Sequence, residues 1–328
     1  MKQLSHHVGW LLPSLLAVSL LTAPQAVAQA YPSGLVRIVI GGPAGSPPDI
    51  ITRIVANELG QAQNWKIIVE NRPGAIQTIA AGDVLKQAAD GYSIYAISLP
   101  AAAAPALLPN LSFRLDTDFA PVIKLMTAHQ VLVVNPSVPA KSLKELVAVL
   151  KAQPDKMTFS SGGFGTPAHL MGEMFRLKTG GRVAHVPYRR LPEAITDLVN
   201  GTNHYQFITS LPVVDLIEAG KLRALAVTAP KRLPSLKHVP TVVEEGFPEL
   251  LVQDWVGLMV KRGTPDEVVA LLNRAINKAL GTPGLREAFE KIAAEPAGGS
   301  PSEFGDFLKT QVAHWSAVVK DSGIKMRE

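Results

Sequence analysis

The chain has 328 residues, a formal net charge of +5 and no cysteine. The lack of cysteine excludes disulfides, thiolate metal sites and a lipid-anchored cysteine. The basic residues are scattered without interleaved aromatic residues, which disfavours a nucleic-acid-binding surface. The eight histidines show no metal-ligand spacing, and we expect neither a metal nor a cofactor.

Residues 1–30 have the pattern of a secretory signal peptide. Lys2 precedes an apolar run from Gly9 to Leu21, and small residues follow at Ala28 and Ala30. The apolar run is shorter than the ~20 residues that a membrane-spanning helix needs. We therefore expect cleavage near Tyr31 and a soluble periplasmic protein of 298 residues, which is long enough for two domains.

Residues 36–59 read as a strand, a glycine-rich turn and a helix. The β-branched run Val36–Ile40 predicts the strand, and the helix is expected to begin with Ser46 as N-cap, Pro47 in the first turn and Asp49 completing a capping box. A glycine-rich turn at a helix start directs free backbone N–H groups and the positive end of the helix dipole toward one point. This point suits an anion.

The same construction is repeated 120 residues later. A strand ending at Ser160 leads into a turn over 161–165, with Thr166 as N-cap and Pro167 at the first helical position. In both segments the first apolar helix residue lies four positions after the cap. Two matched turns a domain length apart predict two lobes that share one small anion.

The remaining elements alternate between strand and helix. A strand is predicted at 66–69 and a helix at 76–89, and residues 90–98 read as a turn followed by a strand. This alternation indicates a parallel sheet with helices on both faces. The run 119–135 is long enough to leave one lobe and enter another, where strands at 183–188, 204–209 and 222–228 form a second α/β unit. A strand at 250–260 returns, and helices at 266–280, 284–294 and 302–321 are expected to follow with no strands between them. This division gives a first lobe of 31–127 with 254–328 and a second lobe of 128–253.

Several segments together resemble one family. They are YPSGLVRIVI, ENRPGA, DGY, HVPYRR, VPTVVEEGFPEL and VVKDSGIK, spread over residues 31–325. The chain resembles the Bug family of extracytoplasmic solute receptors, the substrate-binding proteins of tripartite tricarboxylate transporters. The resemblance implies a two-lobed α/β periplasmic binding protein of type II-like architecture, with two crossing strands as hinge. It also implies a monomer that closes on a carboxylate, delivers it to a membrane permease and has no catalytic residue.

The resemblance also implies a ligand site. Its two loops correspond to Pro43, Ala44, Gly45, Ser46 and Pro47 with Asp49, and to Ser160, Ser161, Gly162, Gly163, Phe164, Gly165 and Thr166 with His169. The rest of the ligand is expected to lie against Ser98, Leu99, Tyr188, Arg189, Thr209 and Ser210.

This sequence departs from the family pattern at a few positions. Pro47 and Pro48 remove two N–H donors from the first loop, and the segment after Ser98, LPAAAAPALLP, is apolar where the family is usually polar. An apolar wall would leave a hydroxylated ligand such as citrate with unpaired groups, so we expect an aromatic or aliphatic dicarboxylate. Arg190 is either a partner for a second carboxylate or a solvated surface residue, and Asp254 is either a polar hinge group or part of the pocket wall.

One alternative reading is an enzyme. Gly163 to Ala168 fits G-x-G-x-x-A, with Arg189 and Arg190 about 20 residues further on, which suggests an NADP-linked oxidoreductase. This alternative is weaker because an exported chain rarely meets loose nicotinamide cofactor. It also leaves Pro167 and the matched turn at 41–45 unexplained.

Overall fold

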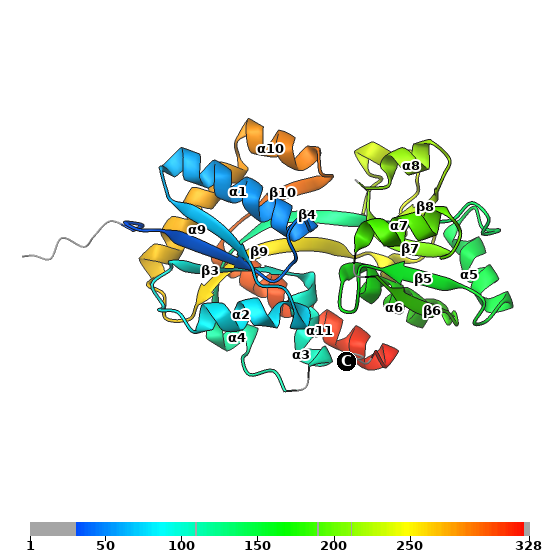
Figure 1. The fold of residues 1–328 in the computed structure, drawn as a ribbon, viewed down its shortest axis with the longest axis horizontal. Coiled ribbons are helices and arrows are strands. Elements are labelled where there is room, and N and C mark those ends of the chain that lie inside the picture. Colours follow the sequence, from blue (N-terminus) through cyan, green and yellow to red (C-terminus); the bar gives the residue numbers. More distant parts are fainter. Residues whose placement is uncertain (1–30, 109, 189, 211, 325–328) are drawn as a thin grey trace, which may run out of the picture.

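The computed structural model describes residues 31–108, 110–188, 190–210 and 212–324. The predicted signal peptide and Arg189 lie outside the described residues. Figure 1 shows two halves side by side, joined by long strands, so the two-lobed α/β fold predicted from the sequence is confirmed.

The half that begins at Tyr31 is built on a parallel sheet. β1 (Val36–Ile40) lies between β2 (Ile67–Asn71) and β3 (Ser93–Ser98). α1 (Pro47–Gln63) packs on one face, and α2 (Thr78–Leu85), preceded by the 3₁₀ turn η1 (Ala75–Gln77), packs on the other.

The second half repeats this plan. β5 (Thr158–Ser161) lies between β6 (Ala184–Pro187) and β7 (Tyr205–Thr209), with parallel pairing. α6 (Pro167–Thr179) and α7 (Leu191–Val199) belong to different hydrophobic clusters on opposite faces. The other elements of this half are α5 (Leu143–Ala152), α8 (Val214–Glu218), β8 (Arg223–Val227), η2 (Pro234–Leu236) and η3 (Pro248–Leu250).

Two long strands connect the halves. β4 (Phe119–Val134) pairs with β9 (Gln253–Lys261) as far as His129, and from Gln130 onward it pairs with β7 and β8. The strand therefore changes partners between His129 and Gln130. β9 begins three residues later than predicted because Leu250 belongs to η3.

The C-terminal part returns to the first half through α9 (Asp266–Leu280), α10 (Pro283–Glu290) and α11 (Pro301–Ser322). The expectation of a tail without strands is wrong, because β10 (Ala294–Gly298) pairs antiparallel with β4. Its sequence, AEPAG, has no β-branched or aromatic residue, so the period-2 pattern gave no signal there. α11 reaches into the second half, where Arg176 Nη2 donates to the carbonyl of Ser322 at 2.9 Å.

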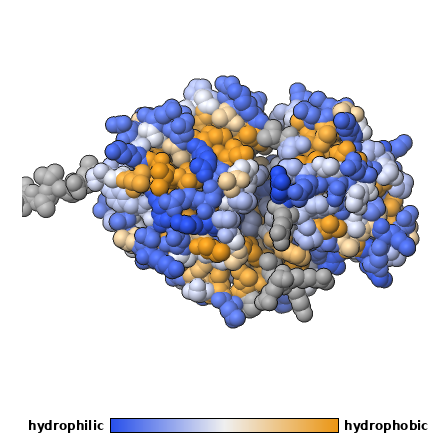
Figure 2. Space-filling view, in the orientation of Figure 1, coloured by the Kyte–Doolittle hydropathy of each residue, from blue (hydrophilic) through white to orange (hydrophobic). Residues whose placement is uncertain are grey.

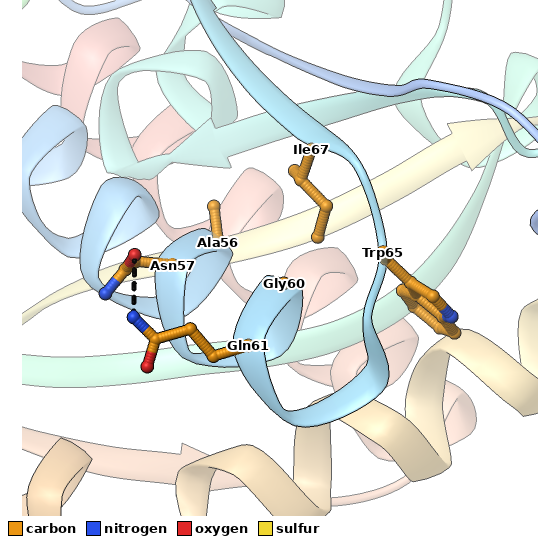
Figure 3. Close-up of a pocket in the computed structure, with 6 residues that line it drawn as sticks. All are labelled: Ala56, Asn57, Gly60, Gln61, Trp65 and Ile67. Carbon is orange, nitrogen blue, oxygen red and sulfur yellow. Dashed lines mark hydrogen bonds between the residues drawn. The ribbon is translucent and has the colours of Figure 1, made fainter.

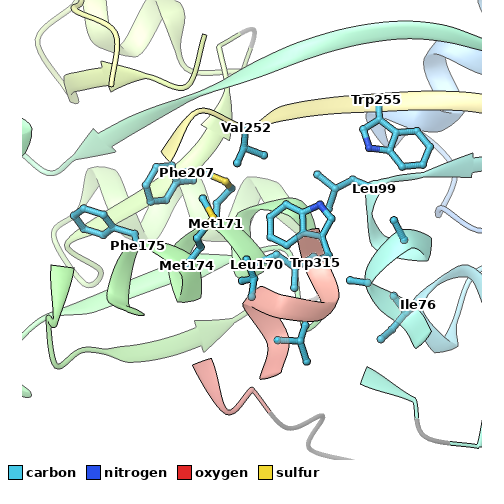
Figure 4. Packing of buried hydrophobic residues seen from close by; sticks show 14 of the residues in the cluster. Ile76, Leu99, Leu170, Met171, Met174, Phe175, Phe207, Val252, Trp255 and Trp315 are labelled. Carbon is cyan, nitrogen blue, oxygen red and sulfur yellow. The ribbon is translucent and has the colours of Figure 1, made fainter. Parts of the chain in front are cut away.

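The apolar segment after Ser98 forms helix α3 (Leu99–Leu107), followed by the short helix α4 (Leu115–Asp118). Leu99 is fully buried and shares a hydrophobic cluster with Ile76, Leu170 and Trp315. Figure 4 shows these side chains meeting between the two halves. This stretch is thus part of the core that joins the lobes, where apolar residues gain most from burial.

Candidate functional site

Both predicted loops lie where the strand order of a parallel sheet reverses. In the first half, β2 lies on one side of β1 and β3 lies on the other. In the second half, β6 lies on one side of β5 and β7 lies on the other. In open α/β sheets, ligands bind outside the carboxyl ends of the strands at such switch points. Loop 1 (41–46, after β1) and loop 2 (162–166, after β5) occupy these positions.

The two loops share a backbone conformation. Gly45 and Gly165 have φ of +77° and +74°, as expected for turns that require glycine. The caps that follow, Ser46 and Thr166, have φ/ψ of −72°/156° and −68°/157°. The match predicted from residue spacing is therefore also a match in geometry.

Each loop is held by the side chain four residues after its glycine. The N–H of Gly45 donates to Asp49 Oδ2 at 2.9 Å, and the N–H of Gly165 donates to His169 Nδ1 at 3.1 Å. These two N–H groups are thus used within the protein, and Asp49 and His169 act as positioning residues for the loops.

The predicted capping box in loop 1 is wrong. Ser46 makes no side-chain cap, and Asp49 instead binds Gly45 N–H, Arg53 Nε at 3.0 Å and Asn71 Nδ2 at 2.8 Å. The Ser46 N–H that a capping box would use donates instead to the carbonyl of Pro43 at 3.1 Å. The cationic Arg53 holds the Asp49 carboxylate away from it. Ser46 Oγ is buried without a hydrogen-bond partner among the described residues.

Loop 1 is also less positive than the sequence suggests. Burial alone would raise the pKa of Asp49, but hydrogen bonds from Arg53, Gly45 N–H and Asn71 outweigh it and lower the pKa. The charged carboxylate lies in the first turn of α1 and offsets the positive end of the helix dipole.

Loop 2 rests on a group of aromatic rings. The rings of His169 and His185 are 4.3 Å apart, and Phe164 packs edge-on against both. Burial lowers the pKa of His169 to about 4, and burial together with the neighbouring His169 lowers the pKa of His185 to about 3. Both rings are therefore neutral at pH 7 and add no positive charge to loop 2.

Hydroxyl groups fix the remaining shape of loop 2. Ser161 Oγ lies 2.7 Å from His185 Nε2 and 3.1 Å from the N–H of Gly163, which has φ of +118°. Thr166 Oγ1 donates to the carbonyl of Gly163 at 2.7 Å and accepts from the N–H of His169 at 3.4 Å. Ser160 Oγ donates to Gln206 Oε1 at 3.2 Å.

The two loops meet at one dipeptide that sequence reasoning missed. A Cβ on Gly165 would lie 3.2 Å from Ile76 Cγ1, and a Cβ on Gly41 would lie 2.3 Å from Gln77 Cβ. Ile76 and Gln77 have φ of +52° and +70°, a conformation that a β-branched residue rarely adopts. Strain of this kind is concentrated at binding sites. The only sequence signal was the flexible Gly74 in ENRPGA.

Ser98 and Gln77 form a buried hydrogen-bonded pair. Gln77 Nε2 donates to Ser98 Oγ at 2.5 Å, and the N–H of Ser98 donates to Gln77 Oε1 at 3.2 Å. The Ser98 hydroxyl is thus occupied in holding the strained turn. Its neighbour Leu99 lies in the core rather than along an open wall.

The other predicted residues differ in their surroundings. The Tyr188 hydroxyl lies 2.5 Å from both Asp197 Oδ2 and Asn203 Nδ2, while its carbonyl lies near Gly163. Ser210 follows Thr209 at the end of β7, and its buried Oγ has no partner among the described residues. Arg190 is an exposed side chain 3.6 Å from Glu193, the surroundings of a solvated arginine.

The surface has hollows elsewhere too. One cavity of about 240 Å³ is lined by Ala56, Asn57, Gly60, Gln61, Trp65 and Ile67, around the C-terminal half of α1 (Figure 3). Another of about 460 Å³ is lined by Arg72, Thr78, Ile79, Gly82, Asp83 and Lys86. Neither contains a residue of loop 1 or loop 2. Figure 2 shows a groove between the two halves on this face of the molecule.

Two lobes joined by crossing strands, with matched helix starts meeting across a groove, define a two-lobed solute-binding protein. The family described as tripartite tricarboxylate transporter family receptor matches residues 51–324. The chain belongs to this family.

Similar proteins have been found in several bacteria. Protein BugT of Bordetella pertussis is 32% identical over 302 residues, which cover 92% of this chain and 93% of BugT. Among solved structures, Rpa4515 of R. palustris with adipate is 31% identical with a TM-score of 0.80, covering 90% of this chain and 99% of that one. MatC of Rhodopseudomonas palustris with bound malate is 29% identical with a TM-score of 0.78, covering 88% and 100%.

Proposed function

We propose that this protein is a periplasmic receptor that captures a small carboxylate, an aromatic or aliphatic dicarboxylate, between its lobes and delivers it to the permease of a tripartite transporter. The observation that supports this most strongly is the meeting of loops 1 and 2 at Ile76 and Gln77. Adipate and malate bound to proteins of the same fold and family support a carboxylate as the ligand class. None of the described helices is long and apolar enough to cross a membrane.

In this proposal the lobes are residues 31–127 with 254–328 and residues 128–253, and the receptor acts as a monomer. The partner change of β4 at His129 and Gln130 lies close to the proposed boundary. Closure brings the free N–H groups of both loops to the same carboxylate, so that neither lobe alone binds tightly. The residues proposed to hold the ligand are those of the two loops together with Ser98, Tyr188, Thr209 and Ser210.

A thermal-shift screen of the protein without residues 1–30 tests this function. The panel contains mono- and dicarboxylates, aromatic and aliphatic, with NADP⁺ and NADPH in the same plate. We expect at least one carboxylate to raise the Tm, because a ligand that binds only the folded state stabilises it. Stabilisation by the nicotinamide cofactors and by no carboxylate would instead favour the oxidoreductase.

A further inference from the structure

A buried polar pair connects the two crossing strands. Gln130 Nε2, on β4, donates to Asp254 Oδ2, on β9, at 3.0 Å. Gln130 is only 3% exposed. Gln130 Oε1 and Asp254 Oδ1 are both buried, and neither has a hydrogen-bond partner among the described residues. The pair therefore offers two unused acceptor oxygens.

The pair lies where strands of both lobes end. Gln130 is opposite Thr209, the last residue of β7. On β9, Val256 is opposite Ser98, the last residue of β3. Because β3 and β9 run antiparallel, Asp254 lies two residues past the end of β3 along its neighbouring strand. The carboxyl ends of parallel strands are where ligands bind, so the pair lies next to the region where a ligand between the lobes is expected.

The two side chains also lie on the ligand-facing sides of their strands. Because side chains alternate along a strand, Asp254 shares a face with Val256, which clusters with Ile51 and Val55 of α1. In the same way Gln130 shares a face with Leu132, which clusters with Leu170 of α6. These are the helices that begin at loops 1 and 2.

The negative charge of the Asp254 carboxylate has few stabilising partners in this position. Burial raises its pKa to about 6, only partly offset by the hydrogen bond from Gln130. The carboxyl is therefore largely ionised at pH 7. Among the described residues, no ion pair includes it. Burying a charge without a partner has an unfavourable free energy of desolvation. A ligand group that donates a hydrogen bond to the carboxylate offsets this penalty.

We propose that Gln130 and Asp254 select a ligand that carries a hydrogen-bond donor, an amino or hydroxyl group, in addition to the carboxylate held by the loops. The inference rests on the proposed carboxylate-receptor function and narrows its ligand class. An ammonium is favoured over a hydroxyl because it also neutralises Asp254. The carbon skeleton between the two ends need carry no further polar group.

Calorimetry on matched acids tests this selection. There are three series of probes, and each begins with the acid that lacks the donor. They are succinate with malate and aspartate, adipate with 2-aminoadipate, and benzoate with 4-hydroxybenzoate and 4-aminobenzoate. In the series that binds, we expect the wild type to prefer the donor-bearing acid by at least about tenfold, the factor that 1.4 kcal/mol gives. Asp254→Asn should remove most of this preference.

Controls keep the outcomes distinct. Asp306→Asn removes an exposed carboxylate on α11 that pairs with Lys309, and it should keep the wild-type preference. Asp254→Ser replaces Asp254→Asn if the latter does not fold. A wild type that prefers the donor-free acid, or a preference that survives Asp254 substitution, overturns the selection alone. If no carboxylate of the panel or of the thermal-shift screen binds, the proposed function fails and the selection fails with it.

Discussion

At the scale of single residues, each loop is held by a side chain from the helix that follows it. Gly45 and Gly163 both have a positive φ, a conformation that glycine adopts readily. Asp49 was placed at the helix start correctly, but its partners Arg53 and Asn71 were not foreseen because Asn71 comes from a different strand. Ile76 and Gln77 escaped prediction altogether, since nothing in their residue types favours a left-handed turn.

His169 gives a prediction about pH. Its pKa in the folded state, about 4, lies below the value of 6.5 in an unfolded chain, so the unfolded state binds the proton more readily. As the pH falls from 6.5 to 4, this difference costs on the order of 3 kcal/mol of folding stability, at about 1.4 kcal/mol per pKa unit. Above pH 6.5 the cost disappears.

The variant His169→Asn isolates this effect. Asparagine keeps an acceptor near the N–H of Gly165 but does not titrate in this range. We expect its Tm to fall less steeply than that of the wild type between pH 6.5 and 4. Parallel curves of Tm against pH for the two proteins would show that His169 contributes no such linkage.

At the scale of elements, the strands β1 to β9 were predicted from hydrophobic period and turn residues. The failures have physical causes. β10 lacks strand-forming residues and exists only because β4 offers it an edge, and α3 was taken for a pocket wall because a buried alanine helix has no polar face. The conformation of β10 and the burial of α3 are therefore set by contacts with distant parts of the chain.

The cap of α6 gives a prediction with a closely matched control. Thr166 and Thr282 are both N-caps followed by proline, and each accepts a 3.4 Å hydrogen bond from the N–H three residues on. Thr166→Val and Thr282→Val should each lower the stability by about 1 kcal/mol. Thr166→Val alone should also weaken carboxylate binding at least about tenfold, because its hydroxyl fixes the carbonyl of Gly163 in loop 2.

Calorimetry with the carboxylate found by thermal shift compares the two variants. If both variants bind the carboxylate as tightly as the wild type does, loop 2 is not part of the binding site. A loss of binding in both would mean that general destabilisation, rather than loop geometry, causes the effect.

At the scale of the whole molecule, the sequence predicted two lobes and a pair of crossing strands, which matches the observed connections. It did not predict the third link, α11, which packs on α3 in one half and reaches Arg176 of the other. The amphipathic pattern of a helix indicates that one face is buried but not which element covers it. The contact between loop 2 and Ile76 was equally invisible, because it joins residues about 90 positions apart.

The central claim is that one ligand engages both lobes at once. The most direct test is an amide NMR titration of the ¹⁵N-labelled protein with the carboxylate that gives the largest thermal shift. We predict that the amides of Gly42 and Ala44 in loop 1 and of Gly162 and Phe164 in loop 2 respond together, with one Kd and a 1:1 stoichiometry. Responses confined to the loop of one lobe, or two separate binding curves, would contradict a clamp formed by both lobes.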